Sequence, residues 1–341
     1  MNEEKIIINK INTGYTEPEF LDSDYIFGSG QAPDPIINES GQWPAVEEET
    51  QIKNYDLFNC TGFATLTPVE ILLRHQGIFA NYSDRFLGIV AGTYPPGNDP
   101  GKVVEALRKN GAIAETMLPF SDDLKNVDEY YSFKGANETD CRNAGKEWLR
   151  TYFYKHDWID PYSNEISKKI LIEALKRSPL SIAVFAWAKK DEKYFRPEGE
   201  RDSHLTTLIG YKENEYWIVL DSYSPFIKHL EWDFKFYTAK RHFIKPLTQE
   251  EKETIIRIET NISIWQKMIN WIFEAIELLK KKQELENKPP VILPPQESIP
   301  EAKPEPPKPE PQKYLWDTFE NARHSARVIM DVFNLTWKEK D

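Results

Sequence analysis

The feature that most constrains the fold is a change in apolar periodicity near residue 180. Before it, apolar residues recur at helical spacings. After it they alternate with a period of two in three runs, 180–185, 204–211 and 216–221. The polar sequence 212–215 separates the last two runs and predicts a hairpin. Helices that come first and antiparallel strands that follow predict an α+β fold with segregated halves.

The helical half contains one element whose start has two interpretations. Apolar spacing predicts a helix after Cys60, and others around residues 103–110, 144–154 and 166–176. Thr67-Pro68-Val69-Glu70 is a capping box with proline at the first helical position, which would start the first helix at Thr67 and leave Cys60 in a turn. If that helix instead begins at Cys60, Pro68 lies inside it and must kink it.

Composition narrows the classes of function. A net charge of −12 over 341 residues argues against nucleic acid as a partner, because phosphate binding needs clustered cations. Two distant cysteines give no disulfide framework and slightly favour a reducing compartment. The run Ile6-Ile7-Ile8 is too short for a signal peptide, and no apolar run is long enough to span a membrane. We expect a cytoplasmic or virion-associated protein.

The chain divides by composition into five segments: an extended N-terminal arm at 1–45, a catalytic domain at 46–248, an amphipathic helix at 249–287, a Pro-rich linker at 288–312 and a helical segment at 313–341. The arm is expected to lie across a domain surface, or else to be partly disordered. The linker is expected to be an extended polyproline II spacer.

The amphipathic helix carries a heptad pattern between residues 255 and 279. Its apolar residues recur at alternating spacings of three and four: Ile255, Ile258, Ile262, Trp265, Ile269, Ile272, Ile276 and Leu279. This pattern predicts a homo-oligomer, and isoleucine at both core positions favours three or more strands. Ile264, Trp271, Phe273 and Leu278 widen the apolar face, so a helix packed on the domain or in a membrane interface remains an alternative.

Cys60 is either a nucleophile or a small buried hydrophobe, and alone it would more often be the latter. However, His204 opens one strand of the predicted hairpin and Asp221 ends the next, so the two side chains are expected to meet. Aspartate would orient the imidazole of a Cys60–His204–Asp221 triad. Gln51, or less favourably Asn54, would donate to the oxyanion together with the Cys60 N–H. No cofactor is expected, and the other histidines lack metal-ligand spacing: His75, His156, His229, His242 and His324.

These elements, in this order, resemble the papain-like cysteine peptidases over roughly residues 40–245. The matching stretches are Gln51, Cys60–Ala64, 97–107, 179–184, 204–211 and 216–223. The resemblance implies a two-lobed fold, a helical lobe and an antiparallel β-barrel lobe, with a peptide bound between them. It also implies Gly101 as a backbone clamp for substrate, Ala183 and Ser203 near the main specificity pocket, and Tyr223 beside the histidine.

The chain departs from that family at several positions. Asp221 stands where the family usually has asparagine, and Tyr223 replaces a shielding tryptophan. Residues 1–45 are too short and too poorly helical to match the family's inhibitory propeptide. A bacterial or phage member is expected, and residues 316–340 loosely resemble the opening of lysozyme-like regions in some phage proteins.

Three functions compete at this point. The first is a cysteine peptidase acting on a peptide or protein. The second is a related acyl-transfer enzyme, such as a peptidoglycan amidase or a deconjugating enzyme. The third is a non-catalytic virion or assembly protein, which would gain support if the arm filled the cleft.

Overall fold

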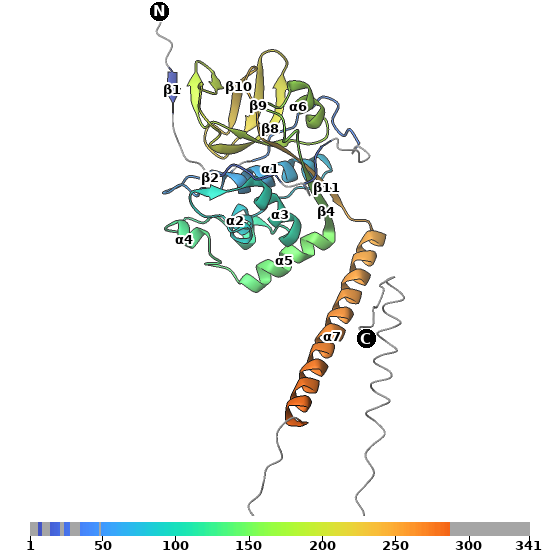
Figure 1. Ribbon diagram of the computed structural model, residues 1–341. Helices are drawn as coiled ribbons and strands as arrows, with labels where there is room; N and C mark the ends of the chain where they lie inside the picture. The colour runs from blue at the N-terminus through green and yellow to red at the C-terminus, as the bar shows by residue number, and fades with distance from the viewer. Residues whose placement is uncertain (1–5, 9–13, 21–23, 28–34, 48, 287–341) are drawn as a thin grey trace, which may run out of the picture. The chain divides into compact units, whose positions relative to one another are not determined.

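The computed structural model describes residues 6–8, 14–20, 24–27, 35–47 and 49–286 (Figure 1). The chain divides into two compact units, Met1–Met268 and Ile269–Asp341, with the boundary inside its last described helix. The predicted linker at 288–312, the segment at 313–341 and the lysozyme-like resemblance lie outside the described residues.

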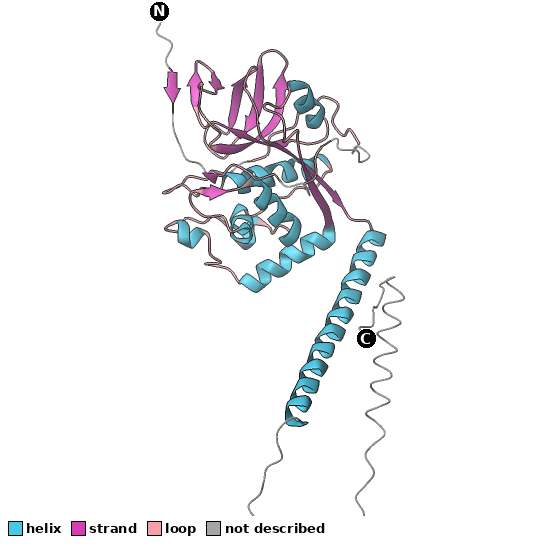
Figure 2. Cartoon of the chain, in the orientation of Figure 1, coloured by secondary structure: helices cyan, strands magenta, loops and turns pink. Residues whose placement is uncertain are grey.

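Helices and strands of the first unit are largely segregated, with the short helix α6 on the strand side and the short strands β2 and β3 on the helical side (Figure 2). The helical elements are α1 (Cys60–His75), α2 (Asp84–Ala91), α3 (Pro100–Asn110), the 3-10 turn η1 (Glu115–Met117), α4 (Val127–Tyr130), α5 (Glu138–Thr151), α6 (Lys168–Leu175) and α7 (Gln249–Glu286). The strands are β1 (Ile6–Ile8), β2 (Gly14–Tyr15), β3 (Gly97–Asn98), β4 (Tyr152–Trp158), β5 (Leu180–Val184), β6 (Ala188–Lys190), β7 (Lys193–Phe195), β8 (His204–Lys212), β9 (Tyr216–Leu220), β10 (Ile227–Glu231) and β11 (Ala239–Pro246). The predicted α+β organisation is confirmed.

The three period-two runs form β5, β8 and β9, and β8 and β9 are the predicted antiparallel hairpin. Within the described residues, the large sheet has the order β1-β6-β7-β10-β9-β8-β5-β11-β4. β1 and β4 each pair with a single neighbour and stand at its two ends. The described sheet is therefore open: within the described residues, the β-barrel lobe that the resemblance implies does not close.

Helix α1 lies at the centre of the unit, and every residue from Cys60 to Leu73 is buried. It contacts β5, β8 and β11 of the sheet on one side and α2 and α3 on the other. This arrangement explains why the α1 sequence lacks a polar stripe. Because α1 packs between the sheet and the other helices, its first residue, Cys60, lies at the junction of the two halves.

The start of α1 resolves the two interpretations in favour of Cys60. Pro68 lies inside the helix, where it cannot donate a hydrogen bond to the carbonyl of Ala64. The Ser181 hydroxyl, from β5, donates to that carbonyl instead. The buried backbone group lost to proline is thus satisfied by a neighbouring strand, and the helix continues through it.

Helix α7 covers the predicted heptad region, and the apolar side chains of its described part remain largely solvent-exposed. Those exposed by about half or more are Ile256, Ile258, Ile262, Ile264, Ile269, Trp271, Phe273, Leu278 and Leu279. No helix within the described residues has the length and apolar character needed to cross a membrane.

Candidate active site

Cys60 occupies the first turn of α1 and is completely buried. The N-cap residue, Asn59, makes no capping bond; its amide donates to the carbonyl of Asp84 and to the Tyr130 hydroxyl, both at 3.0 Å. The first turn of α1 contains no acidic residue. A thiolate here would be stabilised by the dipole of the helix.

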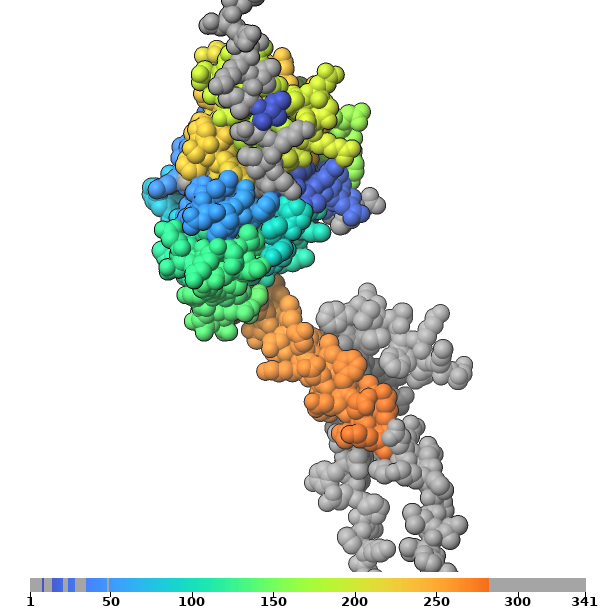
Figure 3. All heavy atoms as spheres, turned by 90° about the vertical axis from the view of Figure 1, so that its left-hand side faces the viewer, coloured from blue at the N-terminus to red at the C-terminus, as the bar shows by residue number. Residues whose placement is uncertain are grey.

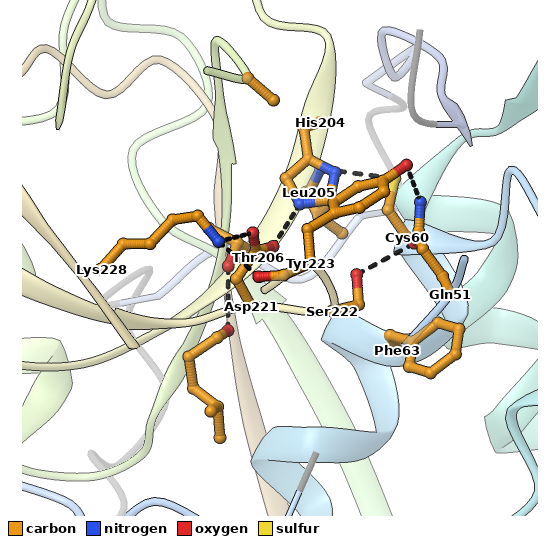
Figure 4. A network of polar contacts seen from close by, with 12 residues as sticks. Gln51, Cys60, Phe63, His204, Leu205, Thr206, Asp221, Ser222, Tyr223 and Lys228 are labelled. Carbon is orange, nitrogen blue, oxygen red and sulfur yellow. Dashed lines mark hydrogen bonds and ion pairs between the residues drawn. The ribbon is translucent and has the colours of Figure 1, made fainter. Parts of the chain in front are cut away.

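His204 begins β8 and lies next to Cys60 in space. The backbone N–H of Leu205 donates to the Cys60 Sγ at 3.5 Å, which joins the start of β8 to the start of α1. On its other side, His204 pairs through Nε2 with the Asp221 carboxylate (Figure 4). Because Nε2 is committed to Asp221, proton exchange with Cys60 would run through Nδ1.

Asp221 is fully buried and uses both carboxylate oxygens. Oδ1 faces His204, and Oδ2 accepts a 2.6 Å hydrogen bond from the Lys228 ammonium. Burial alone would raise the pKa of Asp221, but the charges and hydrogen bonds of His204 and Lys228 outweigh it and hold the pKa below its usual value. The carboxylate therefore stays ionised without solvent.

Gln51 is buried beside this group, although its side-chain amide is engaged with protein groups. Its Nε2 donates to the Tyr223 hydroxyl and, at 3.3 Å, to Asp56, while its Oε1 accepts from the Ser222 hydroxyl at 3.0 Å. The amide can donate to an oxyanion only by giving up one of its two acceptors, Tyr223 or Asp56. Figure 4 shows Gln51 on the same side of His204 as Cys60.

Tyr223 covers the histidine, as the resemblance implies. Its ring centre lies 5.2 Å from that of His204, and its hydroxyl donates to Asp56 Oδ2 at 2.6 Å. Burial, reinforced by Asp56, raises the pKa of Tyr223, so its hydroxyl stays protonated as a donor. Trp187 packs edge-on against His204 at 5.6 Å, so two aromatic rings flank the imidazole.

The expected substrate-binding residues fall in two places. Ala183 packs with Cys60, and Ser203, next to His204, donates its backbone N–H to Val184 at 3.0 Å. Gly101 instead lies in the first turn of α3, where its N–H binds Asp99 at 2.6 Å, and it lines a separate cavity of about 460 Å³. The backbone that pairs with an extended segment is that of β3, Gly97–Asn98.

That extended segment belongs to the chain's own N-terminal arm. β2 runs parallel to β3, and Thr16 N–H donates to Asn98 at 3.0 Å. Gly14 and Gly97, both at positive φ, touch so closely that a Cβ on Gly97 would lie 2.0 Å from Gly14. Only glycine allows this approach. In Figure 3 the described arm residues, in dark blue, lie against the strand and helical halves.

Tyr15, at the end of β2, covers Cys60. It packs on an apolar cluster of Cys60, Ala64, Ala183 and Leu205. Its hydroxyl reaches Thr238 Oγ1 at 3.4 Å. The arm thus contributes to the complete burial of Cys60, a role that the composition of residues 1–45 did not indicate.

Sequence reasoning missed Tyr15, Asp56 and Lys228. The first two have no local signal, because they reach the site only through tertiary contacts. Lys228 had one: it shares the inward face of β10 with Leu230, and a buried lysine requires a partner. Within the described part of the chain, no group of three or more His, Cys, Asp or Glu side chains could hold a metal ion.

Comparison with known proteins gives structural matches alone, since no family model and no curated sequence matches the chain. Xylellain, a cysteine protease from Xylella fastidiosa, matches with a TM-score of 0.51 and 14% identity, covering 73% of this chain and 99% of that one. Procathepsin L 3 of Tenebrio molitor matches at 0.45 and 16%, over 70% and 77% of the two chains. Bromelain from Ananas comosus matches at 0.42 and 17%, over 60% and 94%. The likeness to xylellain shows that this chain has a papain-like fold.

Proposed function

We propose that the protein is a cysteine peptidase. The observation that carries the proposal is the junction of α1 and β8, where Leu205 N–H meets the Cys60 sulfur and the adjacent His204 is held by Asp221. The Cys60 thiolate attacks the substrate carbonyl carbon, and His204 gives a proton to the departing amine. Water then cleaves the thioester, with His204 as the base.

Gln51 is the proposed side-chain donor to the oxyanion, with the Cys60 N–H as the other donor. The neutral Tyr223 hydroxyl accepts one of the amide hydrogens of Gln51, and this is the contact that Gln51 can give up. The oxyanion would then replace the Tyr223 contact.

The arm supports a peptide as the substrate. Residues 14–16 lie extended along β3 and bury an aromatic side chain beside Cys60, so the groove accommodates an extended backbone with a large apolar residue. A substrate must displace this segment to reach the sulfur, so the peptidase described here is latent.

The arm also favours the third function considered above, a non-catalytic assembly protein, because in such a protein Cys60 can stay covered. The test is labelling of the full chain by a peptide-like epoxide, which alkylates an activated thiolate. We expect slow labelling of the wild type and of Cys141→Ala, through transient opening of the arm, and none of Cys60→Ala. His204→Ala should label far more slowly, by about 100-fold or more.

Labelling of Cys60 should become faster once the arm is weakened by Tyr15→Ala. If Cys60 remains unlabelled in that variant while the protein stays folded, the peptidase proposal is wrong and the assembly function stands.

We also propose self-association through residues 255–279 of α7, with a second copy of this chain as the partner. The argument is the heptad spacing of side chains that are exposed in the single chain. Ile262 lies on the seam and Ile264 does not, yet they are 54% and 51% exposed. Light scattering should show a lower native mass for Ile262→Asp and an unchanged mass for Ile264→Asp. Equal masses for both variants and the wild type would contradict the proposal.

A further inference from the structure

Lys228 enters the site from β10 and is almost fully buried. Its ammonium donates to three acceptors, each at 2.6 Å: Asp221 Oδ2 and the carbonyls of Tyr223 and Pro225. A neutral amine has two N–H groups, whereas an ammonium has three. Burial lowers the pKa of Lys228, but three acceptors at this distance favour the charged form.

The charges around Asp221 balance only when Lys228 is counted. Asp221 faces His204 on β8 and Lys228 on β10, with the Tyr194 phenol of β7 nearby. In the reactive form, Cys60 carries a negative charge and His204 a positive one. The carboxylate adds a further negative charge, which Lys228 cancels. Without Lys228, the buried set of Cys60, His204 and Asp221 would carry one uncompensated negative charge, which is costly away from water.

Trp187 seals this pair from solvent. Its ring lies 5.0 Å from the Lys228 ammonium and packs edge-on against His204. Because water is excluded, the charge of Lys228 is poorly screened and acts on the neighbouring groups with more force than at a surface.

We propose that Lys228 is a positioning residue of the active site: it holds the second oxygen of Asp221 and neutralises it, so that the carboxylate orients His204 without opposing the Cys60 thiolate. This inference rests on the proposed function. The Asp221–Lys228 pair thereby orients His204 with no net charge, as a single neutral carboxamide side chain would.

The test is a charge cycle, read as the pH midpoint at which Cys60 becomes reactive to iodoacetamide. All variants are full-length and carry Tyr15→Ala, so that the groove is equally open. Lys228→Met should raise the midpoint and Asp221→Asn should lower it, each by about one pH unit, since a nearby charge favours the oppositely charged form. The double variant should return to the starting value.

A residue that only holds the loop would not produce shifts of opposite sign. The proposal is overturned if both single variants shift the midpoint in the same direction, or if the double variant stays with Asp221→Asn. If the single variant Lys228→Met fails to fold, the comparison of the double variant with Asp221→Asn still decides. Iodoacetamide reports on the thiol alone, so absence of peptide hydrolysis in every variant would reject the peptidase and leave this result readable.

Discussion

Two of the chain's Thr-x-x-Glu sequences, at residues 67–70 and 248–251, lie within or at the start of a helix and are used in opposite ways. Thr248 and Glu251 form a true capping box at the start of α7: Glu251 N–H donates to the Thr248 hydroxyl at 3.2 Å, and Thr248 N–H donates to Glu251 at 2.8 Å. The first box, at residues 67–70, lies in the middle of α1.

In α1 the same residue types serve the interior. The Thr67 hydroxyl donates to the Phe63 carbonyl at 2.8 Å, within the helix, and Glu70 accepts the backbone N–H of Tyr82 at 2.7 Å. A capping box marks the start of a helix only where the residues before it are not helical. Burial between two layers keeps the preceding residues helical in α1, whereas α7 begins in solvent.

The largest expected difference between the two helices is in packing. Leu72 is 2% exposed and Leu278 is 67% exposed. Leu72→Ala should lower the free energy of unfolding by about 2–5 kcal/mol, because it leaves a cavity. Leu278→Ala should change it by less than about 0.5 kcal/mol. Denaturant unfolding at low protein concentration measures both, and equal losses would break the comparison.

The two glutamates should differ next. Burial raises the pKa of Glu70 to about 8, against an ordinary value of 4.5. The folded protein therefore keeps a proton that the unfolded chain has released, and stability falls as pH rises from about 4.5 to about 8. Glu70→Gln should raise the free energy of unfolding by roughly 2–4 kcal/mol near the upper end of this pH range, and by little near the lower end.

Glu251 provides the matched control. A hydrogen bond from Lys245 lowers its pKa to about 2, and the group is in solvent. Its contribution is present at neutral pH and is lost as pH falls below about 4.5. Because solvent screens this pair, Glu251→Gln should leave unfolding at pH above 7 nearly unchanged. A gain as large as that of Glu70→Gln would show that burial is not the cause.

The smallest expected effect concerns the covered end of α1. Tyr15→Ala removes the ring that packs on Cys60 and Ala64, so kcat/KM for a peptide should rise by about 10-fold. Tyr25→Ala, from the same arm but 55% exposed, should not change it. A fall in activity for Tyr15→Ala would mean that the arm helps to build the site.

The strand half was predictable from sequence because its hairpin is local. A short polar turn leaves one register for β8 and β9, and this brings His204 and Asp221 together. The end of α5 was not predictable in this way. Helical spacing predicts a helix as far as Tyr154, but β4 begins at Tyr152 because pairing with β11 satisfies the backbone there.

The rest of the site depends on contacts between distant segments. The carbonyl that Pro68 leaves unbonded is satisfied by the Ser181 hydroxyl, and Gly97 must be glycine because the backbone of Gly14 packs against it. Neither partner can be found from spacing along one chain. Glycine and proline, read locally, indicate turns and breaks, which is why the arm was expected on a surface and the helix start stayed open.

The pairing of β2 with β3 has a consequence for concentration. The arm is tethered to the groove that it occupies, so its effective concentration there is on the order of millimolar, whatever the protein concentration. Dilution cannot release it. A free peptide must exceed that local concentration or bind more tightly, whereas a single cut between residues 16 and 35 would convert the arm into a dissociable ligand.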